Sequence, residues 1–210
     1  MKYLVIIVVA AIFFFAGRRS AQYVYNPVTK EIESAQAYHS RKKNIVMLGD
    51  SHIARGTWIN LLNRCDVGSF GSGGATSVAV LAMAKHALNA RPVKCFVNVG
   101  VNDIAGGVGR DEYIGNMDSI ISVMAGHCEL YVYHIMYTAD GYPGFIQFNE
   151  KIRDYNIALD SLCALRKVTV INLNALFAPA GTLLSGFTSD NIHLNDTAYK
   201  IWSVELDKYL

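Results

Sequence analysis

Hydrophobic residues from Asn44 onward are grouped in short apolar runs that alternate with longer segments of helical periodicity. The apolar runs predict strands at residues 44–49, 66–70, 93–99, 130–135 and 168–173. Helices are predicted at residues 52–63, 77–89, 111–125 and 146–165, and a last helix begins near Asp196. Continuous apolar runs are typical of strands buried on both faces, and strands that alternate with helices form parallel sheets. The pattern therefore predicts an α/β fold, a three-layer α/β/α sandwich around a mostly parallel five-stranded sheet.

The first 19 residues have a different pattern. Tyr3 to Ala16 form an unbroken apolar run behind Lys2, which is typical of a signal peptide or an uncleaved membrane anchor. No cleavage site of small residues follows, which favours the anchor, although the run is shorter than the ~20 residues that span a bilayer. A buried core helix is the alternative. We interpret residues 1–19 as a signal or anchor segment and expect a membrane-anchored or exported protein of the cell envelope. Basic residues flank the run on both sides, so its orientation stays open.

Residues 20–43 are polar, lack clear periodicity and contain Pro27, and we interpret them as a tether to a domain at residues 44–210. Charge is divided at the same point. Residues 1–43 hold seven of the 19 Lys and Arg but two of the 17 Asp and Glu, so the predicted domain has a net charge of −3. A mildly acidic domain argues against a nucleic-acid partner. The basic residues near the apolar run fit a membrane surface.

The four cysteines are widely spaced and form no CxxC pair: Cys65, Cys95, Cys128 and Cys163. Zinc sites usually need closely spaced ligand pairs, so no metal is expected. Cys95 and Cys128 lie in or beside predicted strands, where reduced cysteine commonly serves as a small buried apolar residue. We expect reduced, structural cysteines, with disulfides as the alternative if the domain is exported.

The first predicted strand ends in Gly49-Asp50-Ser51-His52, directly before a predicted helix. A serine at such a turn exposes its hydroxyl near a helix N-terminus, where it can act as a nucleophile. Serine and aspartate are also favoured helix caps, so capping is the alternative reading for Ser51 and for Asp50. The motif alone does not distinguish a nucleophile from a cap.

Amide and glycine residues follow the other early strands. The third strand leads into Gly100-Val101-Asn102-Asp103, where the Asn102 amide can donate to a developing oxyanion. An Asx turn that closes the strand is the alternative. The second strand leads to Gly73-Gly74, where a backbone N–H can approach a ligand without a Cβ in the way. Carboxyl ends of parallel strands share one edge of a sheet, so we expect these groups near Ser51.

Asp190 and His193 lie near the C-terminus with two residues between them. This spacing lets a carboxylate orient an imidazole while the other ring nitrogen faces a nucleophile. A surface Asp–His pair before a helix is the alternative. His134, which ends the fourth predicted strand, is the rival base, and His52 is expected to point into the following helix.

Four of these segments, in this order, resemble the motifs of the SGNH (GDSL-like) hydrolases. The first motif is Gly49-Asp50-Ser51, and the second contains Gly74. The third is GxND at Gly100 to Asp103, and the fourth is DxxH at Asp190 to His193. The first motif is followed here by histidine, where leucine is commoner. The resemblance covers all of the predicted domain and implies a flavodoxin-like strand order.

The resemblance also implies a serine esterase. Its catalytic residues would be Ser51, Asp190 and His193, and its oxyanion hole would consist of Ser51, Gly74 and Asn102. No cofactor and no metal are implied.

The expected substrate is an acetyl or other short acyl ester on a carbohydrate or small molecule. The reason is that the strand-end loops at residues 105–110 and 137–145 are short and rich in glycine and tyrosine. Three alternatives stay open because a fold does not determine a function: an O-acyltransferase on a glycan, a lipase or lysophospholipase, and a non-catalytic glycan-binding module.

Overall fold

The computed structural model describes residues 42–210, which form one compact unit. The predicted signal or anchor at residues 1–19 and the tether at residues 20–43 lie outside this range, except for the last two residues of the tether. The second of these, Lys43, is buried, and its Nζ donates to the Cys65 carbonyl oxygen at 3.2 Å. Between residues 42 and 210, no helix combines the length and the apolar character needed to cross a membrane.

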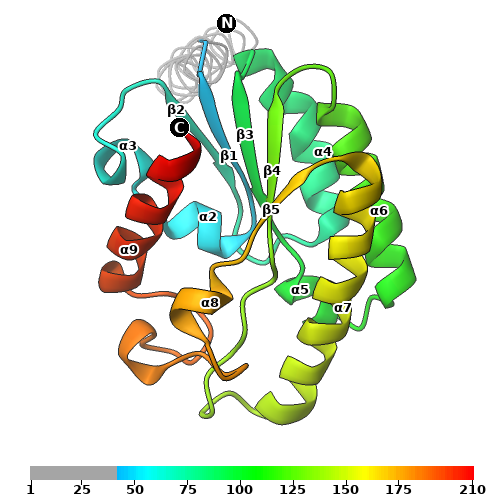
Figure 1. Ribbon diagram of the computed structural model, residues 1–210, viewed down its shortest axis with the longest axis vertical. Coiled ribbons are helices and arrows are strands. Elements are labelled where there is room, and N and C mark those ends of the chain that lie inside the picture. Colours follow the sequence, from blue (N-terminus) through cyan, green and yellow to red (C-terminus); the bar gives the residue numbers. More distant parts are fainter. Residues whose placement is uncertain (1–41) are drawn as a thin grey trace, which may run out of the picture. The chain divides into compact units, whose positions relative to one another are not determined.

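The described part of the chain forms one sheet of five parallel strands in the order β2-β1-β3-β4-β5 (Figure 1). The strands are β1 (Ile45–Gly49), β2 (Val67–Gly71), β3 (Lys94–Asn98), β4 (Glu129–Tyr133) and β5 (Thr169–Ile171). In this flavodoxin-like order the winding direction reverses between β1 and β3, and ligands bind beyond the carboxyl ends of the strands at such a point. The predicted parallel sheet is confirmed.

Helices cover both faces of the sheet (Figure 1). One face is covered by α4 (Ser77–Ala87), α6 (Arg110–Met124) and α7 (Phe145–Arg166). The other face is covered by α2 (Ser51–Arg55), α3 (Trp58–Leu61), α8 (Asn174–Phe177) and α9 (Asp196–Leu206). The remaining elements are the short helix α5 (Val101–Ala105) and the 3-10 turns η1 (Leu88–Ala90), η2 (Ser185–Phe187) and η3 (Asp207–Tyr209). This arrangement confirms the predicted three-layer sandwich.

The central strands are buried on both faces, which explains why their sequences are continuously apolar. Val46 and Leu48 of β1 pack in the core beneath α4, α6 and α7, whereas Met47 packs in the core beneath α9. In β3, Cys95 and Phe96 alternate in the same way. None of these five side chains has exposed surface, and burying each apolar side chain contributes about 1.5–3 kcal/mol. Strands anchored on both faces hold the turns that follow them in fixed positions.

The prediction of one continuous helix at residues 52–63 is wrong. The segment is helical, but it forms two short helices, α2 and α3, with a break between them. The break occurs at Gly56, which ends α2 with an extended backbone. A Cβ on Gly56 would lie 2.4 Å from the ring of Trp58, so glycine is the residue that fits. The Trp58 indole N–H donates to the Ile53 carbonyl oxygen at 2.8 Å, which links α3 to α2 across the break.

No disulfide joins the four cysteines, all of which lie in the described range. Cys95 and Cys163 are buried, and burial raises the pKa of the Cys163 thiol to about 12. The positions of Cys95 and Cys163 fit a structural role, whereas Cys65 is exposed and Cys128 is partly buried, and the reduced state stays a prediction.

Candidate active site

The carboxyl ends of β1 and β3 bring two predicted site segments side by side. Gly49 of β1 pairs with Asn98 of β3, and the Asp50 N–H donates to the Asn98 carbonyl oxygen at 3.1 Å. Beyond this pair each strand turns directly into a short helix, α2 or α5. Ser51 and Asn102 therefore lie at the same edge of the sheet, as the sequence predicted.

The Ser51 hydroxyl is not used to cap its helix. Asp50 is the N-cap of α2, and its Oδ1 accepts the His52 N–H at 2.9 Å. Gly49 permits the tight turn before it, because a Cβ there would lie 1.9 Å from the Asn98 carbonyl oxygen. The serine hydroxyl is thus left for a partner outside the helix.

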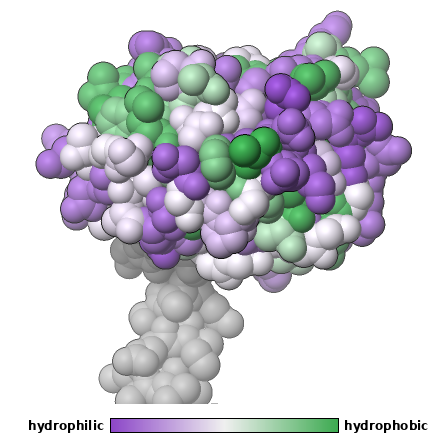
Figure 2. Space-filling view, turned by 90° about the horizontal axis from the view of Figure 1, so that it is seen from below, coloured by the Kyte–Doolittle hydropathy of each residue, from purple (hydrophilic) through white to green (hydrophobic). Residues whose placement is uncertain are grey.

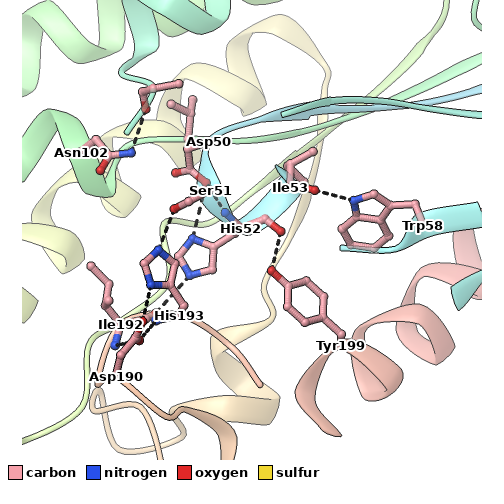
Figure 3. Close-up of polar contacts among 12 residues, drawn as sticks. Asp50, Ser51, His52, Ile53, Trp58, Asn102, Asp190, Ile192, His193 and Tyr199 are labelled. Atoms are coloured by element: carbon pink, nitrogen blue, oxygen red, sulfur yellow. Dashed lines mark hydrogen bonds and ion pairs between the residues drawn. The ribbon is translucent and has the colours of Figure 1, made fainter. Parts of the chain in front are cut away.

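That partner is a histidine from the far end of the domain (Figure 3). Ser51 Oγ lies 2.9 Å from His193 Nε2, and His193 Nδ1 lies 2.7 Å from Asp190 Oδ2. His193 and Asp190 lie in the loop that precedes α9, which packs on the same face of the sheet as α2. The structure brings together the three residues that the sequence predicted.

The surroundings of Asp190 keep its carboxylate charged. Its Oδ1 accepts the backbone N–H of His193 at 2.7 Å and that of Ile192 at 3.2 Å, and Arg55 Nη1 lies 3.5 Å from its Oδ2. Partial burial raises the pKa of Asp190, but these backbone bonds and the bond to the His193 ring outweigh it and lower the pKa to about 2. Asp190 is therefore a carboxylate at neutral pH.

A carboxylate only accepts hydrogen bonds, so His193 donates its Nδ1–H to Asp190. Nε2 then carries a lone pair and accepts the hydroxyl hydrogen of Ser51. The arrangement can take a proton from the serine and hold the resulting imidazolium beside a negative charge. These are the requirements for acyl transfer by an activated serine.

The predicted oxyanion donors are linked to one another. Asn102 Nδ2 donates to the Ala75 carbonyl oxygen at 2.9 Å, which uses one of its two amide hydrogens. Gly74 precedes Ala75 and has a φ of +74°, while a Cβ there would meet nothing within 4 Å. Glycine is thus needed for the left-handed backbone rather than for space. In the view of Figure 3, Ser51 lies between Asn102 and the pair formed by His193 and Asp190.

The sequence of residues 47–201 matches the model of the GDSL-like Lipase/Acylhydrolase family. The chain belongs to this family. The match contains all of the site residues described above. The SGNH resemblance drawn from the motifs is confirmed.

The proteins to which the chain is similar share at most about a quarter of its residues in the matched regions. An N-acylneuraminate cytidylyltransferase of Streptococcus agalactiae serotype III is 25% identical over 161 residues, which are 76% of this chain and 37% of that protein. The chain thus spans little more than a third of the curated relatives that it matches. A GDSL-like lipase from Bacteroides thetaiotaomicron has a TM-score of 0.69 at 19% identity, covering 86% of this chain and 98% of that chain. An acetylxylan esterase from Geobacillus stearothermophilus has a TM-score of 0.66 at 16% identity, covering 80% and 94%. The solved structures share the fold.

His134, the rival base, is engaged elsewhere. Its Nε2 lies 2.8 Å from Oδ1 of Asp160 on α7. Across residues 42–210, no group of three or more His, Cys, Asp and Glu side chains is placed to hold a metal ion. The candidate site therefore consists of Ser51, His193 and Asp190, which contact one another in that order, and the proposed donors around them.

Asp103 is a buried residue of the site region to which the sequence reasoning gave no role. Its Oδ2 accepts the Ser77 N–H at 2.9 Å, and its Oδ1 accepts the Ser77 hydroxyl at 2.5 Å. Asn116 Nδ2 in turn donates to Ser77 Oγ at 2.9 Å. Burial raises the pKa of Asp103, although the bonds from Ser77 oppose this. Asp103 ties α5, which carries Asn102, to the start of α4. The sequence signal that could have indicated this role is the position of Asp103 at the end of the GxND motif.

His52 does not point into the following helix, so that prediction is wrong. α2 ends three residues later at Arg55, and the buried His52 ring packs against the ring of His193, with the two centroids 5.5 Å apart. His52 Nε2 lies 3.1 Å from the Ile192 carbonyl oxygen (Figure 3). The signal in the sequence was the histidine that stands where leucine is commoner in the first motif.

Proposed function

We propose that the protein is a serine esterase that removes a short acyl group, acetyl above all, from a carbohydrate or small molecule through an acyl-serine intermediate. One observation carries the proposal: the continuous series from Ser51 Oγ to His193 Nε2 at 2.9 Å and from His193 Nδ1 to Asp190 Oδ2 at 2.7 Å. These distances allow direct proton transfer between serine and imidazole.

In the first half of the reaction, the Ser51 oxygen attacks the ester carbonyl carbon while His193 Nε2 takes the hydroxyl proton. The bond between the carbonyl carbon and the alcohol oxygen then breaks, and His193 returns the proton to the departing alkoxide. The acyl group is left on Ser51. Asp190 orients the ring and stabilises the imidazolium, because it remains a carboxylate throughout.

In the second half, water attacks the acyl carbon and gives its proton to His193, which passes it to the Ser51 oxygen as the acid departs. Both tetrahedral intermediates carry a negative oxygen. The proposed donors to this oxygen are the backbone N–H groups of Ser51 and Gly74 and the remaining amide hydrogen of Asn102. Each such donor typically stabilises the transition state by about 3 kcal/mol.

The proposed substrate is supported by the loop at residues 137–145. This loop contacts the loop that contains Asp190 and His193, which we call the catalytic loop, because the Ala139 N–H donates to the Asn191 carbonyl oxygen at 2.8 Å. Its two ends, Tyr137 and Phe145, line a pocket of about 190 Å³ whose wall also contains the charged side chains of Glu150 and Arg153 but none of the three catalytic residues. This volume is smaller than the ~300–1,000 Å³ of typical ligand pockets, and aromatic rings beside polar groups suit a sugar.

The surface of the same end of the molecule also favours a polar substrate. Figure 2 views the domain from below, and hydrophilic and hydrophobic residues are interspersed there rather than gathered in one apolar face. Two of the similar proteins are named for carbohydrates, a xylan in one and a neuraminate in the other, whereas the family and another solved structure are named for lipases. The mixed surface favours a sugar ester over a lipid.

A comparison of p-nitrophenyl esters tests the proposal. The Ser51→Ala variant should lose turnover of the acetyl ester while its thermal midpoint stays near that of the wild type. Acetyl should be cleaved faster than butyryl, and butyryl faster than palmitoyl. A preference for palmitoyl would make the protein a lipase-type esterase. Transfer of acetyl to an added sugar in place of water would make it an acyltransferase.

The apolar run at residues 3–16 supports the further proposal that the enzyme is anchored in a membrane or exported. A membrane-impermeant fluorophosphonate reagent, which reacts with activated serines, should then label Ser51 in intact cells. Labelling seen only after lysis would contradict export.

A further inference from the structure

His52 joins the segment that carries the nucleophile to the segment that carries the base. It is the second residue of α2, directly after Ser51, and only 2% of its surface is exposed. Its Nε2 lies 3.1 Å from the carbonyl oxygen of Ile192, the residue directly before His193. A carbonyl oxygen only accepts, so Nε2 carries a hydrogen in both charge states of the ring.

The backbone of His52 is itself held firmly. Its N–H donates to Asp50 Oδ1 at 2.9 Å, and its carbonyl oxygen accepts the hydroxyl of Tyr199, on α9, at 2.6 Å. Its Nδ1 is buried without a hydrogen bond and lies 3.4 Å from Asp50 Oδ1, an ion-pair distance for a protonated ring. The imidazole therefore projects from a fixed point toward the catalytic loop.

The loop that receives this bond needs support. Asn191, between Asp190 and His193, has a φ of +69°, a left-handed conformation that a non-glycine residue adopts at a cost. Such a conformation persists where the surroundings determine it. Here the Ala139 N–H holds the Asn191 carbonyl oxygen at 2.8 Å, and His52 holds the next carbonyl oxygen in the chain.

We propose that His52 is a positioning residue, whose Nε2–H fixes the loop of Asp190 and His193 at the separation from Ser51 that proton transfer requires. The inference rests on the proposed function of that loop as catalytic base. Leucine, the commoner residue at this place in the motif, fills space but cannot hold the carbonyl. A displacement of about 1 Å between reacting groups can lower a rate about a hundredfold, so a single bond at this point has a large effect.

Three substitutions test the proposal in the full chain. His52→Leu removes the donor, while His52→Gln keeps an N–H donor at a similar reach but cannot be titrated. His134→Leu is the matched control, because it removes another bonded imidazole, the one that pairs with Asp160, outside the proposed machinery.

With p-nitrophenyl acetate, His52→Leu should lower kcat roughly tenfold to a hundredfold with little change in KM. His52→Gln should recover most of that loss, and His134→Leu should keep the kcat of the wild type. A His52→Leu enzyme with wild-type kcat, or equal losses in the leucine and glutamine variants, would overturn the proposal. The proposal would also be overturned if the loss of kcat in His52→Leu were fully explained by a smaller fraction of folded protein.

A second measurement needs no substrate and separates this inference from the proposed function. The proton between His193 Nδ1 and Asp190 Oδ2, which are 2.7 Å apart, should give a downfield NMR signal in the wild type. That signal should broaden or vanish in His52→Leu and persist in His52→Gln. If the wild type cleaves no ester, the proposed function fails. If the signal is the same in all variants, the positioning role fails.

Discussion

The carboxylate of Asp103 binds both polar groups of Ser77, the backbone N–H at 2.9 Å and the hydroxyl at 2.5 Å. Neither residue has exposed surface. Asp103 follows Asn102 on α5, and Ser77 begins α4, two residues after the Ala75 carbonyl that Asn102 holds. Two parallel links therefore fix the segments of two proposed oxyanion donors, Asn102 and Gly74, relative to each other.

Replacing Asp103 with alanine should destabilise the domain by about 1–3 kcal/mol, because it leaves buried polar groups of Ser77 without a partner. Urea unfolding measures this loss. Asp111→Ala is the matched control, since the Asp111 side chain is 90% exposed and its loss should change stability by less than about 0.5 kcal/mol. Equal stability of the two variants would show that the Asp103 link contributes nothing.

Replacing Asn102 with alanine removes a proposed oxyanion donor and its bond to Ala75. We expect kcat on p-nitrophenyl acetate to fall about 10²–10³-fold, with a much smaller effect on KM, because the oxyanion exists only in the transition state and the intermediates. Steady-state kinetics measure both constants, on a variant whose thermal midpoint shows that it is folded. An increase in KM at constant kcat would instead assign Asn102 to substrate binding.

Replacing Asp190 with asparagine removes the charge that sets the His193 tautomer. An amide can donate to Nδ1, which leaves the hydrogen on Nε2, so the ring no longer accepts the Ser51 proton. We expect kcat to fall on the order of 10³–10⁴-fold. In the wild type, acid inactivation should not follow titration of Asp190 above about pH 3, because its pKa lies at about 2. Activity of the asparagine variant near that of the wild type would remove Asp190 from the mechanism.

The stability of the protein should depend on pH through His52. Burial lowers the pKa of this imidazole, but the nearby Asp50 carboxylate and the Ile192 carbonyl raise it more, so the pKa lies above the ordinary value of 6.5. Arg55, on the same helix, opposes the rise, and the His193 ring faces the His52 ring from the catalytic loop. The folded state thus binds the His52 proton more tightly than the unfolded state.

A folded pKa above the unfolded value contributes stability that is complete below pH 6.5 and is lost as the pH rises through the folded pKa. The free energy of unfolding of the wild type should therefore exceed that of His52→Gln by more at about pH 5 than at about pH 9. Urea unfolding at both values checks this. A difference that grows as the pH rises would contradict the protonated His52–Asp50 pair.

Much of the fold could be predicted because its strands are buried on both faces. A run such as Ile45 to Leu48 has no polar position, so its type and place are read directly from the sequence. α5 and α8 were not predicted, since helices of five and four residues are too short to display a helical period. The break at Gly56 depends on the Trp58 ring, a contact that only the folded chain reveals.

The reactive residues could be predicted for a related reason. Ser51 and Asn102 each follow a recognisable strand, and His193 stands in a recognisable motif before the last helix. The supporting contacts could not, because they join segments far apart in the chain: His52 meets Ile192 across 140 residues, and Asp103 meets Ser77 across 26. No local pattern encodes such pairs.

The chemical reactivity of Ser51 is the sharpest test of the proposed catalytic serine. A fluorophosphonate reagent should add one mass increment to the wild-type protein, and peptide mapping should locate it on Ser51. His193→Ala should react at least about 10³-fold more slowly, because the serine has lost its base, while its far-UV circular dichroism stays unchanged. Equal labelling of the wild type and His193→Ala, or labelling at a residue other than Ser51, would contradict an activated serine at this edge of the sheet.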